Sequence, residues 1–308
     1  MSLSRVCTRV GVYPPVTMVS SAGDSTAADS FWESTAAGTI HWYHAGLNAW
    51  LTKEAAEAGP ADPKADRWVG WKADAAAGIV RAEQSLLRWT PWDAACDDAS
   101  TPVIRWFHAA QTNAAFNEID RHVLMGHGNS TALIGVTSND GMHESLALHA
   151  LLCESAAVAR ALIADYCLVP EADRMAIYLQ NDARAVAYIE AAKRAGVPYV
   201  AVASGTSSRA LASRLADTGA AVLVTSADLV SVAQEARQLV AVPPAGVLVP
   251  PATTAVEGWQ LAVSAHELAG DGSAVLAPPE QRVAALWRLA PPRPVDASFP
   301  LFVLYTSG

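Results

Sequence analysis

Four short β-rich runs alternate with helical patterns in the middle of the chain, and this alternation limits the choice of fold more than any other feature. The runs read TALIGV, RMAIYL, VPYVAVA and AAVLVT. Between them, apolar residues recur at helical spacing over 144–166, 183–195 and 208–218. Such alternation is typical of a mostly parallel sheet flanked by helices. The sequence therefore predicts an α/β fold.

Composition divides the chain into two regions. Residues 1–130 hold eight of the ten tryptophans, and the segments AGLNAWLTKEAAEAG and KADAAAGIVRAEQSLLRW have helical patterns. We therefore expect a Trp-rich, helical and irregular N-terminal region in which most indole rings are packing anchors. Residues 131–308 are expected to form the α/β part, with further strands in the proline-rich stretch at 246–250 and 301–305.

Charge and hydropathy argue against two classes of partner. The formal net charge is -9, whereas proteins that bind nucleic acids or anionic membranes in general need a basic face. No run approaches the ~18 apolar residues of a membrane span, and the N-terminus has no apolar core typical of a signal peptide. The four cysteines form no CxxC pair or disulfide framework. These features predict a cytoplasmic protein that binds neither nucleic acid nor membrane.

Two loops fit a ligand site of an open α/β sheet. In such sheets ligands bind beyond the carboxyl ends of the strands, where helix N-termini present free N–H groups. The run VPYVAVA is followed by a hydroxyl- and glycine-rich loop that begins at Ser204 and Gly205, and the last run, LFVLY, is followed by Thr306, Ser307 and Gly308. Ser, Thr and Gly there suit a phosphate. The first loop equally fits a plain helix cap.

Glycine and histidine patterns elsewhere point to structural roles. The stretch GHGNST at 126–131 follows no strand and indicates a turn, and neither a GxGxxG nor a GxxxxGK[ST] pattern occurs. His41 with His44, and His122 with His127, have no Cys or carboxylate that completes a metal-ligand set. The sequence therefore predicts no metal site.

Carboxylates and cysteines add no catalytic pattern. Asp97, Asp98 and Asp120 are expected to be solvated or capping carboxylates rather than an acid/base pair. No G-x-S-x-G elbow and no defensible Cys/His pair is present. Residue chemistry alone thus indicates an α/β protein with a candidate anion site and no catalytic residue.

A series of spaced residues across 86–308 resembles a known family. The first part of the series is Trp89, Pro91, Trp92, Trp106, Phe107, Asn113, Asn117, Asp120, Arg121 and His122. The helix–strand units of 172–226, the segment WQLAVSAHEL and the closing FPLFVLYTSG follow in order. This order resembles the AMP-forming short-chain acyl-CoA synthetases, the acetyl- and propionyl-CoA synthetase group of the adenylate-forming superfamily.

The resemblance implies a partial N-terminal lobe of the adenylate-forming fold and an ATP-dependent ligase. In such enzymes a short-chain carboxylate (acetate, propionate or 3-hydroxypropionate) becomes an acyl-adenylate and then a coenzyme A thioester. Mg²⁺ is expected as a cofactor of this reaction. The resemblance assigns ATP phosphate contacts to Thr306, Ser307 and Gly308, and coenzyme A contacts to Ser204 and Gly205. It assigns no catalytic or metal-binding residue within the chain.

Two departures from the family pattern bear on these expectations. The Arg-Gly-Gly segment that the family has after the strand at 220–225 is missing, and residues 226–231 read Ser-Ala-Asp-Leu-Val-Ser. The segment before residue 86 is longer than usual. The ligase part of fused propionyl-CoA synthases, which carry hydratase and reductase parts, resembles this extended N-terminus.

The family's phosphate loop normally continues beyond the residue at which this sequence stops. We therefore expect the chain to be an N-terminal fragment of a longer synthetase, and we expect this fragment to be inactive on its own. The sequence leaves the formation of a homo-oligomer open. The alternative is a stand-alone, non-catalytic binding or scaffolding module derived from a synthetase lobe.

Overall fold

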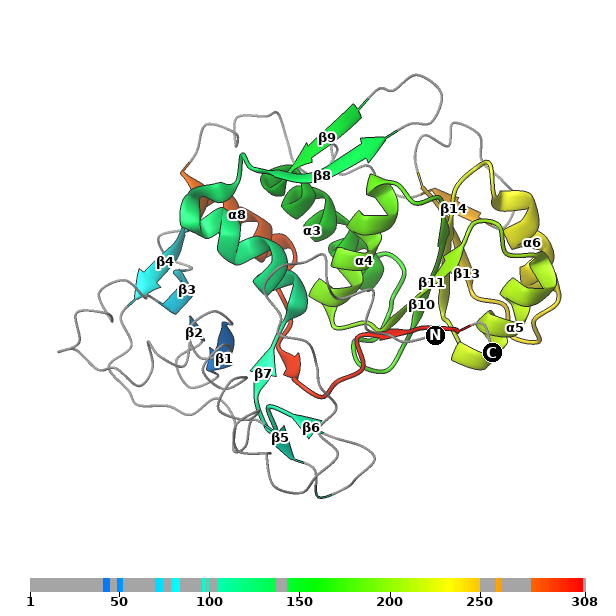
Figure 1. Ribbon diagram of the computed structural model, residues 1–308, viewed down its shortest axis with the longest axis horizontal. Coiled ribbons are helices and arrows are strands. Elements are labelled where there is room, and N and C mark those ends of the chain that lie inside the picture. The colour runs from blue at the N-terminus through cyan, green and yellow to red at the C-terminus, as the bar shows by residue number, and fades with distance from the viewer. Residues whose placement is uncertain are drawn as a thin grey trace, which may run out of the picture.

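The computed structural model of the 308-residue chain describes most residues after position 104 and shorter stretches before it (Figure 1). The described residues are 41–44, 49–51, 70–74, 79–83, 96–97, 99, 105–136, 143–249, 259–261 and 278–306. Predictions on Ser307 and Gly308 lie outside the described residues. Within these ranges, no helix is both long and apolar enough to cross a membrane.

Six parallel strands form the central sheet, in the order β14–β13–β12–β10–β11–β16. The strands are β10 (Met175–Leu179), β11 (Tyr199–Ala203), β12 (Val222–Thr225), β13 (Ala245–Leu248), β14 (Trp259–Leu261) and β16 (Phe302–Val303). All five residues of β10 are buried, because a parallel sheet is covered on both faces and its central strands are apolar throughout. The predicted α/β fold with a mostly parallel sheet is confirmed.

Helices cover both faces of this sheet (Figure 1). Helices α3 (Leu148–Ala164) and α4 (Ala183–Ala195) lie on one face, and α5 (Ser208–Thr218) and α6 (Val230–Gln238) lie on the other. The bounds of α4 and α5 are those that the sequence predicts.

Local signals in the sequence set the ends of α4 and α5. The carboxylate of Asp182 accepts a hydrogen bond from the backbone N–H of Ala185 at 3.1 Å and caps α4. Gly196 and Gly219 end the two helices in the left-handed conformation, with φ of 68° and 59°, which glycine adopts without the strain of a Cβ atom.

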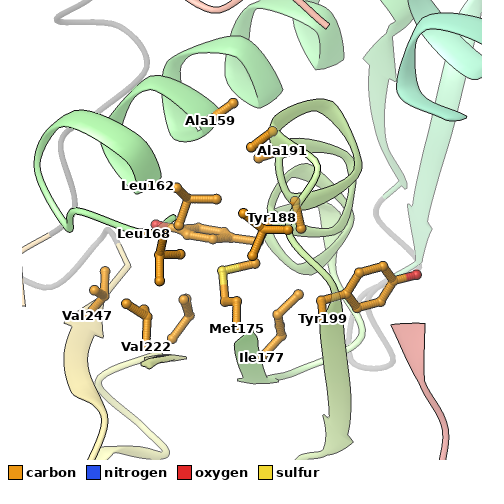
Figure 2. Packing of buried hydrophobic residues seen from close by; sticks show 14 of the residues in the cluster. Ala159, Leu162, Leu168, Met175, Ile177, Tyr188, Ala191, Tyr199, Val222 and Val247 are labelled. Carbon is orange, nitrogen blue, oxygen red and sulfur yellow. The ribbon is translucent and has the colours of Figure 1, made fainter. Parts of the chain in front are cut away.

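Two apolar clusters fill the space between the sheet and its helices, because successive strand residues point to opposite faces. Figure 2 shows the cluster beneath α3 and α4, which includes Leu162, Met175, Ile177, Tyr188 and Val222. The cluster beneath α5 and α6 includes Ala176, Tyr178, Val200, Leu211 and Leu223. The α/β part thus has a core on each side of the sheet.

The chain returns past the N-terminal region before it enters the last strand of the sheet. Helix α8 (Pro279–Leu289) leads to β15 (Val295–Asp296), which pairs antiparallel with β7 (Gln111–Thr112). Two π-helical turns, η4 (Phe116–Asp120) and η5 (Val123–His127), pack with α8 and α3 in a third apolar cluster. Segments far apart in the sequence therefore meet beside the parallel sheet.

A buried ion pair joins these segments. Arg194 donates to the carboxylate of Asp120 at 2.7 and 3.0 Å, and both side chains are fully buried. Trp287 donates to the same carboxylate at 2.6 Å, and Asn113 donates to the carbonyl of Arg293 at 2.8 Å. The prediction that Asp120 is a solvated or capping carboxylate is therefore wrong, since its charge is balanced inside the protein by a residue 74 positions away.

The expectation of helices in the segments AGLNAWLTKEAAEAG and KADAAAGIVRAEQSLLRW is wrong for the described residues of these segments, although η4 and η5 are helical and lie in the same region. Strands β1 (Trp42–His44), β2 (Ala49–Leu51), β3 (Gly70–Asp74) and β4 (Ile79–Glu83) form an antiparallel sheet. The alanine-rich sequence favours a helix locally, but the pairing of neighbouring strands overrides that propensity. The buried Trp50 acts as a packing anchor, as expected, and stacks on a neighbouring phenylalanine ring with centroids 4.4 Å apart.

Two further expectations, on the run TALIGV and on the start of α3, differ from the structure. The run TALIGV forms β8 (Thr131–Val136), which pairs antiparallel with β9 (His143–Ala147) rather than joining the parallel sheet. Helix α3 therefore begins at Leu148 instead of residue 144, because the intervening residues bond to β8. Strands β5 (Cys96–Asp97) and β6 (Arg105–Trp106) form another short antiparallel pair.

Candidate functional site

The two loops that the sequence selects leave the same edge of the sheet. Strands β11 and β16 are hydrogen-bonded neighbours that run parallel, with Tyr199 opposite Phe302 and Val200 opposite Val303. Their carboxyl ends therefore meet, and the loops that begin at Ser204 and Leu304 emerge side by side. The strand pairing thus places the turn at Ser204 and the described part of the second loop, as far as Thr306, at the same edge of the sheet. The expected strand 301–305 is shorter than predicted and ends at Val303.

The turn after β11 is held from within the fold. The hydroxyl of Tyr178, from the neighbouring strand β10, lies 2.8 Å from the carbonyl oxygen of Ser204 and 2.9 Å from that of Thr206. A Cβ atom added to Gly205 would meet no atom within 4 Å. The turn is thus fixed from below while its outer side lies open to a ligand.

A residue other than Ser204 caps the helix that follows this turn. The hydroxyl of Ser207 accepts a hydrogen bond from the backbone N–H of Ala210 at 3.4 Å, which is the N-cap contact of α5. The capping alternative therefore applies to Ser207. Ser204 and Gly205 lie before the cap, at the end of the helix where N–H groups favour anions.

Thr306 is exposed beyond the end of β16, and its neighbour Tyr305 folds back over α5. The hydroxyl of Tyr305 bonds to the carboxylate of Asp217, and the guanidinium carbon of Arg214 lies 5.2 Å from the centroid of the Tyr305 ring. Arg214 also donates to the hydroxyl of Thr206 at 3.2 Å. One helix therefore contacts both candidate loops.

Sequence reasoning missed Arg214, Asp217 and Tyr305. The spacing of Arg214 and Asp217 on α5 indicates a shared helix face, but no local pattern shows that Tyr305 would lie on that face. The contact depends on the pairing of β11 with β16, which are separated by about 100 residues. Only the folded topology brings these side chains together.

A second pair of loops lies at the same edge, beyond β10 and β12. The chain leaves β10 on one side towards β11 and then crosses back to β12 on the other side, so this is the point where the strand order reverses and where open sheets commonly bind ligands. The amide of Gln180 donates to the carboxylate of Asp228 at 3.3 Å across this point. Asp228 belongs to the segment 226–231, which departs from the family pattern.

The histidines take no part in a metal cluster within the described part of the chain, where no three His, Cys, Asp or Glu side chains could hold an ion together. His41 is fully buried. Burial, and then the charges of Arg121 and His122, lower its pKa to about 3, so its imidazole is neutral at physiological pH. The side chain of His44 lies outside the described residues.

Comparison with known proteins identifies the family. Residues 120–308, more than half of the chain, match the family model described as AMP-binding enzyme. An acetyl-coenzyme A synthetase of Paraburkholderia phymatum is 30% identical over 74% of this chain and 34% of its own length. One from Mycobacterium bovis is 31% identical over 86% of this chain and 38% of its own length.

A solved structure shares the fold. The acetoacetyl-CoA synthetase from Streptomyces lividans superposes with a TM-score of 0.55 at 22% sequence identity, over 71% of this chain and 32% of that one. The chain spans about a third of the length of the curated relatives it matches. The family match covers both candidate loops and the strands that carry them, and the chain belongs to the AMP-binding enzyme family.

Proposed function

We propose that the protein to which this chain belongs converts a short-chain carboxylate into an acyl-CoA thioester at the expense of ATP. The observation that carries the proposal is that the turn at Ser204 and Gly205, after β11, and the described segment up to Thr306, after β16, leave the same edge of the sheet. The membership of the AMP-binding enzyme family supports this reading, as does the likeness to acetyl-coenzyme A synthetases.

The proposed reaction has two balanced steps. A carboxylate oxygen attacks the α-phosphorus of ATP, the bond to the β-phosphate oxygen breaks, and acyl-adenylate and pyrophosphate result. The thiol of coenzyme A then loses its proton and attacks the acyl carbon, and AMP leaves with the electron pair. In both steps the protein has to hold negative charge, which preorganised N–H and O–H donors stabilise.

Each loop takes one part of this chemistry in the proposal. Thr306, Ser307 and Gly308 hold the ATP phosphates, and Ser204 and Gly205 lie against coenzyme A. The exposed position of Thr306 and the open space at Gly205 support these roles. Mg²⁺ is proposed to arrive with ATP, because this ion is usually held by substrate phosphates together with one or two carboxylates.

The acid is proposed to be acetate, propionate or 3-hydroxypropionate. The names of the relatives favour acetate, whereas the extended N-terminus resembles that of fused propionyl-CoA synthases and favours the longer acids. Hydratase and reductase parts would accompany the ligase in the fused arrangement. The free thiols of Cys153 and Cys167 agree with a reducing cytoplasm, where ATP and coenzyme A are available.

The test is ATP–pyrophosphate exchange and thioester formation by the full-length protein with each of the three acids. Thr306→Ala should lower the rate of exchange by about 10- to 1,000-fold, the range for the loss of one preorganised donor. Thr131→Ala, at an exposed position on β8, is the matched control and should leave the rate unchanged. Ser204→Ala should mainly slow the thioester step.

Two results would contradict the proposal. Wild-type protein of verified mass that exchanges pyrophosphate with none of the three acids would favour a non-catalytic module. Equal rates for the Thr306 and Thr131 variants would remove Thr306 from the site. The 308-residue polypeptide assayed alone is proposed to be inactive, and pyrophosphate exchange above background by that polypeptide would refute this part.

A further inference from the structure

Three side chains tie the segment after β16 to the helix that follows β11. We propose that Arg214, Asp217 and Tyr305 form a clamp that positions Thr306 and the turn at Ser204 relative to each other. The clamp touches no substrate in this proposal, so its members are positioning residues. The catalytic consequence rests on the proposed function, whereas the anchoring of the chain does not.

The first contact of the clamp fixes the far end of Tyr305. Its hydroxyl donates to the carboxylate of Asp217, near the end of α5. Burial, and then the hydrogen bond to Asp217, raise the pKa of Tyr305 to about 12, so the hydroxyl remains a donor at physiological pH. With its ring on α5 and its hydroxyl held, Tyr305 fixes the backbone from which Thr306 extends.

The second contact joins this anchor to the other loop. The cation of Arg214 lies over the ring of Tyr305, an arrangement that the negative face of an aromatic ring favours. The same guanidinium donates to the hydroxyl of Thr206, in the turn that begins at Ser204. Because an arginine side chain carries five N–H donors on a rigid plane, Arg214 can hold both loops at once.

The turn at Ser204 is therefore held from two sides. Tyr178 bonds to it from the strand below, at the carbonyls of Ser204 and Thr206, and Arg214 bonds to it from the helix. A displacement of about 1 Å at a site that orients reactants can cost on the order of 100-fold in rate. Loss of the clamp should thus slow the reaction without any lost substrate contact.

The experiment combines hydrogen exchange with kinetics on the full-length protein. Tyr305→Phe removes only the hydroxyl, Asp217→Leu the carboxylate that accepts its hydrogen bond, and Arg214→Met the guanidinium. Tyr166→Phe, whose hydroxyl has no hydrogen-bond partner in the described structure, and Arg288→Met, at an exposed position on α8, are the matched controls.

The clamp predicts a specific pattern. Backbone amides of 301–306 should exchange at least about tenfold faster in all three clamp variants than in the controls, because their anchor is lost. ATP–pyrophosphate exchange should fall about 10- to 100-fold in kcat in the Tyr305 and Asp217 variants, with the KM of the acid unchanged. Thioester formation from preformed acyl-adenylate should fall only in Arg214→Met, and Arg214→Lys should restore part of both steps.

The outcomes separate the inference from the proposed function. If amide exchange in 301–306 matches the controls, the clamp is refuted even in an active enzyme. Activity that falls only in step with the thermal midpoint assigns these residues a purely structural role and likewise refutes it. If the wild type shows no ATP–pyrophosphate exchange while the backbone amides of 301–306 exchange hydrogen faster in the clamp variants than in the controls, the anchoring is supported and the proposed function fails.

Discussion

Removal of the buried carboxylate of Asp120 should be among the most destabilising single changes in the described part of the chain. Asp120 accepts three hydrogen bonds, two from Arg194 and one from Trp287. In Asp120→Ala the fully buried Arg194 keeps only its bond to the carbonyl of Ala290, at 2.7 Å. An uncompensated buried charge costs about 3–5 kcal/mol, a large share of the roughly 5–15 kcal/mol that stabilises a domain.

Urea unfolding of the purified protein, followed by tryptophan fluorescence, measures this loss. Asp165→Ala is the matched control, because Asp165 forms an exposed ion pair with Arg160 at 3.4 Å. Surface pairs of this kind contribute about 0–1 kcal/mol. The Asp120 variant should therefore unfold at a clearly lower urea concentration than the Asp165 variant.

A double variant tests the reason for the loss. Asp120→Leu combined with Arg194→Met removes both charges, and the remaining cost is that of the unsatisfied Trp287 N–H and Ala290 carbonyl, about 1–3 kcal/mol for each group. The double variant should thus be less destabilised than the sum of its two single variants. Additive losses, or a loss below about 1 kcal/mol for Asp120→Ala, would refute the account of a charge stranded by its partner.

Two buried positions, Glu190 and Gly246, allow further tests of the structure. Burial raises the pKa of Glu190 from 4.5 to about 7 despite its bond to Lys193 at 2.7 Å. The folded protein therefore binds this proton more tightly than the unfolded chain does. A contribution to the free energy of unfolding on the order of 1–3 kcal/mol is present below pH 4.5 and is lost as the pH rises through 7. Unfolding curves measured between pH 5 and 8 should show this loss of stability in the wild type and not in Glu190→Gln. Gly246→Ala places a Cβ atom 2.6 Å from the ring of Trp259 and should lower the stability of the protein by about 1–3 kcal/mol, measured by thermal denaturation. The control Gly128→Ala, whose added Cβ atom has contacts of 3.5 Å, should leave the stability unchanged. Equal thermal midpoints for the two variants would contradict the clash.

The α/β part of the fold was predictable because its signals are local. The strand β10 is a continuous apolar run, α4 begins at a capping aspartate, Asp182, and both α4 and α5 end at glycines that adopt positive φ. Each signal acts within a few residues of the element that it defines. The bounds of α4 and α5 therefore match the prediction.

The N-terminal sheet was not predictable by the same means. Strands β2 and β4 lie in alanine-rich sequence that favours helices, and their conformation is set by pairing with β3. Likewise β8 reads as one more strand of the parallel sheet until its pairing with β9 is known. Where tertiary pairing decides the structure, local propensity gives the wrong element.

The candidate site was likewise predictable only in part. The loop residues Ser204 and Thr306 were predicted because hydroxyl and glycine residues follow apolar runs, and strand order then places the two loops at one edge. The side chains that hold them were missed. Tyr178 and Tyr305 read as ordinary apolar residues of strands, and only the hydrogen bonds of their hydroxyl groups show that they fix the loops.

The buried ion pair and the site are linked through the segment that leads into β16. Arg194 binds the carbonyl of Ala290, its own carbonyl accepts a hydrogen bond from the backbone N–H of Arg293 at 2.8 Å, and Asn113 holds the carbonyl of Arg293. This segment ends nine residues before Phe302, where β16 begins. The buried ion pair therefore ties down the backbone at Ala290 and Arg293, on the way into the strand that leads to Thr306.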